Sequence, residues 1–203
     1  MNEKTVKKVL NFWFGEVGKE GIPDKEKQKN WWIKDKKLDE LIKNRFENDL
    51  LEARSVKIDE IGTNPDEFLA YVVLLDQFSR NIYRGKPESF SQDSTALNIT
   101  LKGLISGVDK EMVPFKRAFF YMPLMHSEDM DIQKKSVNYF SALEKEFEND
   151  SKFKDLVKQN LKYAVLHHDI IERFGRYPHR NVILGRESTT GEIEFLKGPG
   201  SSF

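Results

Sequence analysis

The segment from Asn64 to Gly85, "NPDEFLAYVVLLDQFSRNIYRG", restricts the fold more than any other stretch of this chain. Asn64 is a good helix cap, Pro65 suits the first helical turn, and Glu67 has the spacing of a capping box. Residues 68–75 are apolar on every side, although charged residues make up 33% of the chain. A helix that is apolar all round must be enclosed by other elements. The sequence therefore predicts a central, buried helix.

The remaining sequence has helical rather than strand periodicity. Further helices are expected from a Thr5 cap to Gly15, from Asp35 to Leu50, from Ser91 to Gly107, from Pro114 to a bend or stop near Pro123, from a Ser127 cap to Phe147, from Lys152 to Gly175, and after a Ser188 cap. A loop with Gly18, Gly21 and Pro23 should precede Trp31. Because the connections are short, successive helices should pack antiparallel. We therefore expect one all-α domain, 1–203, of seven to eight antiparallel helices, ending in a frayed tail at about 197–203.

Charge and composition exclude several classes of function. Lys and Arg number 33 and Asp and Glu also number 33, so an overall electrostatic attraction to nucleic acid is not expected. The chain contains no cysteine, which excludes disulfides and thiolate chemistry. Its longest apolar run is far too short to span a bilayer, and the N-terminal stretch lacks a signal-peptide pattern. We expect a cytoplasmic protein without a membrane partner.

Positive charge is concentrated in "RFGRYPHRNVILGRE", residues 173–187, directly after a long apolar helix. The earlier segment "FSRNIYRG", residues 78–85, has the same order of Arg-Asn, apolar residues and a second arginine. Two such loops could face each other across one concavity. Arginine suits that arrangement because its planar fork binds carboxylate or phosphate through two hydrogen bonds. The candidate ligand-binding residues are Arg80, Asn81, Arg84, Arg173, His179, Arg180, Asn181 and Arg186. Alternatively, these arginines tie loop carbonyls and acids such as Glu187 together.

Polar residues also interrupt the apolar helices. Asp76 and Arg80 are four residues apart on the central helix and should form an internal ion pair. His168 falls on the apolar stripe of the helix at 152–174, so we expect it to point into the core. A buried histidine is either a hydrogen-bonded core residue or a group that transfers protons.

Histidine is therefore the candidate for catalysis. His126, His168 and Glu128 are the expected catalytic residues, with Glu128 or Glu172 fixing the tautomer of the histidine. Neither a phosphate-binding glycine loop, a nucleophile elbow nor a zinc-binding H-E-x-x-H motif is present. A metal held by His126, Glu128, His168 and His179 is conceivable, but we expect no metal and no cofactor.

Four motifs, "FWFG", "LLDQFSRNIYRG", "FFYMPLMHSED" and "RFGRYPHRNVILGRES", together resemble the bacterial family of proteins of unknown function numbered 924. The resemblance runs from about residue 8 to residue 196. It implies an all-helical fold similar to tetratricopeptide repeats, either as a right-handed superhelix or as a compact bundle, and no particular activity. The family's signature positions correspond here to Asp76, Gln77, Phe78, Arg80, Asn81, His126, Ser127, Glu128, Asp129, Arg173, His179, Arg180 and Asn181. The chain departs from the family pattern at Ser79, Tyr177 and Thr190–Gly191.

Three functions follow as hypotheses. The first is a helical binding protein whose groove of arginine and histidine takes an anionic small molecule or an acidic peptide. The second is an enzyme that acts on a small anionic substrate through histidine acid–base chemistry. In the third, the polar cluster only organises the core. An enzyme requires histidine and arginine in one closed pocket, whereas a peptide binder requires arginines spread along an open groove.

Overall fold

The protein is all-α in its computed structural model, which describes residues 1–17, 22–23 and 25–201. The helices are α1 (Glu3–Phe14), α2 (Lys25–Asn30), α3 (Lys36–Ala53), α4 (Pro65–Val72), the π-helix η2 (Val73–Phe78), α5 (Ser79–Ile82), α6 (Asp93–Ser106), α7 (Pro114–Met125), α8 (Met130–Phe147), α9 (Lys154–Phe174) and α10 (Thr190–Leu196). No strand occurs in those three ranges, which confirms the predicted fold class. The tetratricopeptide-like superhelix stays a prediction. The short helix α2 was not expected, and Gly18 and Gly21 of the expected loop lie outside the described residues.

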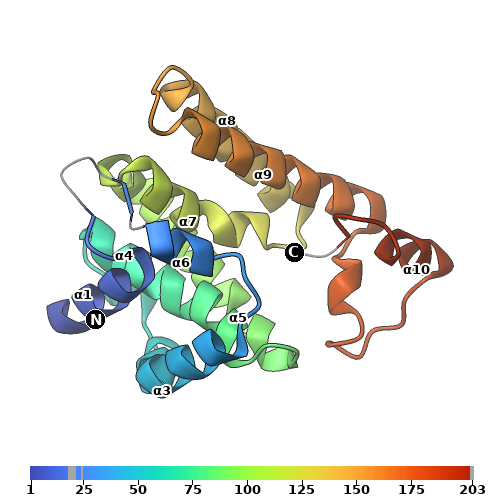
Figure 1. Ribbon diagram of the computed structural model, residues 1–203, viewed down its shortest axis with the longest axis horizontal. Helices are drawn as coiled ribbons and strands as arrows, with labels where there is room; N and C mark the ends of the chain where they lie inside the picture. The colour runs from blue at the N-terminus through green and yellow to red at the C-terminus, as the bar shows by residue number, and fades with distance from the viewer. Residues whose placement is uncertain (18–21, 24, 202–203) are drawn as a thin grey trace.

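α4, η2 and α5 follow one another without a break and form the predicted central helix (Figure 1). Asn64 caps it by accepting a hydrogen bond from the Asp66 amide. The expected capping box is not formed, because the Glu67 carboxylate contacts the amino group of Met1 instead. The side chains from Phe68 to Phe78 are buried. In η2 the Ser79 amide donates to the Leu74 carbonyl, five residues back, so the helix is widened by one residue around Asp76.

Aromatic side chains fill the core on both sides of the central helix. Trp13 of α1 packs edge-on against Phe78 and against Phe119 of α7. Helix α6 approaches α7 closely at Gly103, where an added Cβ would lie 2.6 Å from the ring of Phe120. The central helix is therefore held tightly between its neighbours, which fixes the position of the polar residues at its C-terminal end.

Several helix ends differ from the expectation by one or more residues. Asn2, Asp129 and Thr189 cap α1, α8 and α10, rather than Thr5, Ser127 and Ser188. Each observed cap has extended backbone angles and a side-chain oxygen that accepts a backbone N–H, which is what a cap requires. The helix with Pro123 continues to Met125. By contrast, Gly15, Gly107 and Gly175 end their helices with positive φ, as expected.

The C-terminal part of the chain folds back onto the end of α7. α8 and α9 form an antiparallel pair that projects from the rest, and the segment after α9 returns with α10 as a separate flank (Figure 1). We refer to residues 175–201 as the C-terminal segment. In the expected tail, Ser201 is buried and donates to the Leu196 carbonyl, while 202 and 203 lie outside the described residues. None of the helices in the described ranges is both long and apolar enough to span a membrane.

Candidate functional site

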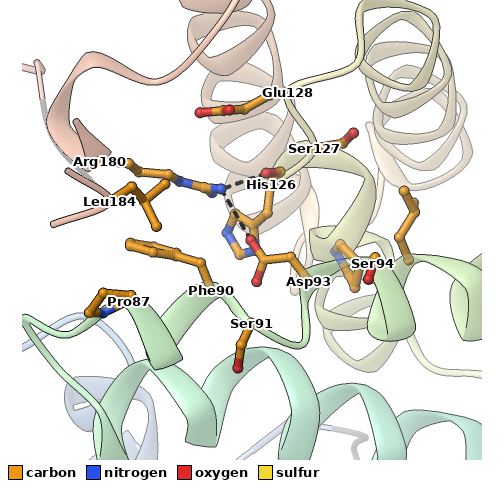
Figure 2. Close-up of a pocket in the computed structure, with 12 residues that line it drawn as sticks. Pro87, Phe90, Ser91, Asp93, Ser94, His126, Ser127, Glu128, Arg180 and Leu184 are labelled. Atoms are coloured by element: carbon orange, nitrogen blue, oxygen red, sulfur yellow. Dashed lines mark hydrogen bonds and ion pairs between the residues drawn. The ribbon is translucent and has the colours of Figure 1, made fainter. Parts of the chain in front are cut away.

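A pocket of about 400 Å³ lies between α6, the end of α7 and the C-terminal segment (Figure 2). Its volume lies within the range of sites for small molecules. The pocket is lined by Pro87, Phe90, Ser91, Asp93, Ser94, Leu97, Pro123, His126, Ser127, Glu128, Arg180 and Leu184. Apolar side chains therefore supply much of the wall, and ionisable groups gather on one side of it.

A histidine held by a buried carboxylate faces this pocket. The Nδ1 atom of His126 lies 2.7 Å from Oδ1 of Asp76, which is fully buried at the end of η2. Arg80 and Gln77 hold the same carboxylate, the former through NH1 at 2.9 Å and the latter through Nε2 at 2.6 Å. Asp76 therefore orients His126, in place of the predicted Glu128 or Glu172.

The charges fix which nitrogen of His126 carries the proton. Burial favours the neutral acid, yet Arg80 and His126 hold the pKa of Asp76 well below its usual range. The ionised carboxylate accepts a hydrogen bond from Nδ1–H, so the Nε2 atom carries the lone pair when the ring is neutral. Burial, opposed by Asp76, lowers the pKa of His126 itself. His126 is thus a neutral base at pH 7, and no residue of the described ranges occupies its Nε2 atom.

Asp93 joins the two arginine motifs beside this histidine. Arg80 forms two hydrogen bonds with the Asp93 carboxylate, at 3.0 and 3.1 Å, and Arg180 forms a third at 3.1 Å. Arg180 also donates to the His126 carbonyl, so it bridges the C-terminal segment and α7 (Figure 2). Its guanidinium lies 4.6 Å from the ring centroids of both Phe90 and Tyr177. Arg180 is therefore fixed in position at the pocket wall.

Further ionisable rings stand behind His126. The ring centroid of His126 lies 6.1 Å from that of His167. The ring of Tyr177 lies beyond it, with its centroid 5.6 Å from that of His167 and 5.5 Å from that of His179. Burial lowers the pKa of His167 to about 3 and that of His179 to about 4, with neighbouring positive charge adding to both shifts. These rings are neutral at pH 7 and form a mainly uncharged support for the site.

Glu128 lines the pocket, but its carboxylate is used to hold the C-terminal segment in place. Its two carboxylate oxygens accept from both terminal nitrogens of Arg186, at 2.7 and 2.9 Å, and one also accepts from the Tyr177 amide. Burial opposes ionisation, but the bonds from Arg186 and Tyr177 lower the pKa of Glu128. Asn181 is fully buried and joins Arg186 to Ser188. The predicted residues Glu128, Asn181 and Arg186 thus hold the C-terminal segment against the core.

Other predicted site residues lie away from the pocket. Arg84 and Asn81 both bind Asp39 of α3. Arg173 is exposed and lies over Phe174. The expected burial of His168 in the core is not observed: His167 is buried, while His168 is partly exposed and contacts Asp169. The two positions are one residue apart and about 100° apart around the helix, and packing of α9 against its neighbours selects the other one.

The structure adds three residues that the sequence did not single out as parts of a site. Asp93 lies in the first turn of α6, where the helix dipole favours any acid. Phe90 precedes that helix with no pattern of its own, and His167 lies one position before the predicted His168. A signal for Asp93 is the need for a carboxylate close to two arginines that follow apolar helices.

Of the four residues considered as metal ligands, His126, Glu128 and His179 belong to no group of three or more close ligand atoms in the described ranges. Within the described ranges, the residues whose ligand atoms lie within 4.8 Å of one another are His168, Asp169 and Glu172, on the outer face of α9. Exposed acidic groups of this kind are common without an ion. They lie outside the pocket described above.

Comparison with known proteins places the chain in a family. A family model described as "Bacterial protein of unknown function (DUF924)" matches residues 9–200. A solved structure of a protein of unknown function from Agrobacterium tumefaciens is 30% identical, with 96% of this chain and 98% of that chain covered and a TM-score of 0.77. No curated protein matches. The chain therefore belongs to the bacterial family of unknown function DUF924.

Proposed function

We propose that this protein is an enzyme that moves a proton on a small substrate bound in the 400 Å³ pocket, with His126 as the acid or base. The observation that carries the proposal is the Asp76–His126 pair at 2.7 Å, made through Nδ1 of a histidine that lines the pocket. A carboxylate at Nδ1 fixes the tautomer and stabilises the imidazolium that forms when Nε2 takes a proton.

Arg180 has a complementary role in this proposal. A guanidinium carries five N–H donors, and the bonds to Asp93 and to the His126 carbonyl use two of them. The remaining donors can stabilise negative charge on the substrate, whether it is present from the start or develops during the reaction. Because Asp93 and the aromatic rings fix the guanidinium, little reorganisation accompanies that interaction.

The proposal is tested with three substrates that sample different proton transfers. Wild-type protein is assayed for hydrolysis of p-nitrophenyl acetate and p-nitrophenyl phosphate, and for exchange of pyruvate methyl protons in D₂O by NMR. Loss of a general acid or base costs about 10²–10⁴-fold in rate, so His126→Asn should lose turnover by that factor. His168→Asn is the matched control because His168 lies outside the pocket. Activity that His126→Asn retains would contradict the proposal.

A binding protein for a small anion is the second candidate, and the fixed cation Arg180 favours it. It predicts ligand binding without turnover of any substrate. A long groove for an acidic peptide has less support, since Arg84 pairs with Asp39 and Arg186 with Glu128. For those two arginines, the purely structural hypothesis has the stronger support.

A further inference from the structure

The charges around His126 are balanced only while its ring is neutral. Asp76 and Arg80 face it from the central helix, Asp93 from α6 and Arg180 from the C-terminal segment. The two positive charges of these arginines balance the two negative charges of the aspartates, and the negative charge of Glu128 is balanced by its own partner Arg186. The neighbouring rings of His167 and His179 are uncharged at pH 7. A proton on His126 would therefore leave one uncompensated positive charge in a largely buried cluster.

A bound ligand with one negative charge would supply the missing compensation. Unpaired charge in a buried site costs several kcal/mol, so an anion and the proton on His126 each make the other more favourable. The same reasoning disfavours a dianion, because a second negative charge finds no further cation. Burial keeps the pKa of His126 low without such a ligand, which leaves room for it to rise on binding.

The pocket wall also indicates the rest of the ligand. Phe90, Leu97 and Leu184 line it, together with two prolines. Arg180 Nε is buried without an acceptor in the described part of the chain, and its guanidinium bounds the same space. An apolar wall beside a histidine and an arginine suits a carboxylate that carries a hydrophobic body.

We propose that the pocket takes a small monocarboxylate with an apolar body and that His126 takes up a proton as this ligand binds. The proposal rests on the proposed function and deepens it by naming the substrate class. With such a substrate bound, His126 is an imidazolium hydrogen-bonded to Asp76. Its first catalytic step is then donation of the Nε2 proton, as a general acid.

Proton uptake gives the binding a characteristic pH dependence. Because the ligand binds the protonated form, its affinity should rise by up to about tenfold for each pH unit between pH 8 and pH 6.5. Below the pKa of the ligand-free ring the dependence should level off, since His126 is then already charged.

Isothermal titration calorimetry with benzoate tests the proposal. Titrations at pH 7.5 in two buffers of different ionisation enthalpy should give an uptake of about one proton. The uncharged isostere benzamide and inorganic phosphate should both bind at least tenfold more weakly. Saturating benzoate should also move the His126 ring resonance to its protonated position by NMR, and His126→Gln should abolish the proton uptake.

The outcomes separate this proposal from the proposed function. Benzoate binding without proton uptake, or phosphate binding as tight as benzoate, overturns it. No benzoate binding at 10 mM, about ten times the upper end of the usual KM range, overturns it as well. In each case, turnover that depends on His126 in the three-substrate assay would leave the proposed function standing. If His126→Gln does not fold, the proton count of the wild-type protein decides.

Discussion

Two arginine motifs, residues 80–84 and 180–186, share the pattern Arg-Asn, apolar residues and a second arginine, but their arginines have two different roles. In each motif the first arginine, Arg80 or Arg180, binds the carboxylate of Asp93 at the pocket. The second arginine binds a different acid nearby: Arg84 pairs with Asp39, and Arg186 with Glu128. The difference shows that a pattern of residues can bring two loops together while only one position of each contributes to the site.

The shared carboxylate should therefore matter most. Asp93→Asn leaves Arg80 and Arg180 close together with less negative charge, and breaking this largely buried pair of bonds should cost about 3 kcal/mol of unfolding free energy. Asp39→Asn, which removes the acid of the more exposed Arg84, should cost only about 1 kcal/mol. Urea denaturation of both variants measures the difference. Equal losses would show that the two motifs are equivalent.

The second motif contains His179 and lies near the buried His167, and the low pKa values of these two histidines make it the acid-sensitive part of the molecule. The unfolded histidines have a pKa near 6.5, against about 3 for His167 and about 4 for His179 in the folded protein. The unfolded state binds more protons between these values, so stability is full above about pH 6.5 and falls as the pH drops. Each histidine contributes up to about 1.4 kcal/mol per pH unit, ending near its folded pKa.

Unfolding free energies between pH 7 and pH 4.5 measure this slope. His167→Gln should lower the slope by the contribution of one histidine in that range. A variant with the wild-type slope would mean that His167 is not the group responsible, and the acid sensitivity would have to come from the other buried rings.

The second arginines should differ more in function than in stability. Arg84→Ala and Arg186→Ala each remove a partly exposed, two-bonded ion pair at a cost of about 1 kcal/mol, and Arg186→Ala should cost about 1 kcal/mol more because the buried amide oxygen of Asn181 loses its donor. Only Arg186 braces the segment that carries Arg180 and Leu184, so only Arg186→Ala should reduce benzoate affinity or turnover. Calorimetry on both variants checks this, and a matching loss in Arg84→Ala would contradict the division of roles.

The smallest effect is expected at His168. It lies on the outer face of α9 and contacts Asp169, so His168→Asn should change the unfolding free energy by less than about 0.5 kcal/mol. Turnover and benzoate binding should be unaffected. A loss of activity would restore His168 to the catalytic role that its apolar stripe suggested.

The sequence predicted most of the fold because helix signals are local. Asn64 with Pro65 marks the start of the central helix, and glycines at 107 and 175 mark two helix ends. Errors arose where neighbouring residues compete for one role, as with Ser127 and Asp129 at the start of α8. There, the backbone path rather than the residue type decides which side chain caps the helix.

The candidate site was only partly predictable because it is assembled from distant segments. The pattern indicated that Arg80, His126 and Arg180 matter; His126 and Arg180 line one pocket, and Arg80 binds the carboxylates of Asp76 and Asp93 beside it. It did not reveal that Asp76 is the partner of His126, since 50 residues separate them and no local spacing connects the two. The choice between His167 and His168 was likewise out of reach, because a helical turn gives both positions an apolar neighbour.

The wide turn of η2 has a consequence for how this site can be lost. A π-turn holds one more residue than an α-helix needs, so the central helix contains, in effect, a single inserted residue before Ser79. The extra residue is taken up within this turn, so deleting one residue from 73–75 would restore regular α-helical winding while the helix on either side keeps its register. The change would be confined to the turn that carries Asp76, and its carboxylate would shift relative to His126 while Phe68 stays anchored in the core. The pairing of these two residues thus depends on local helix winding as well as on their identity.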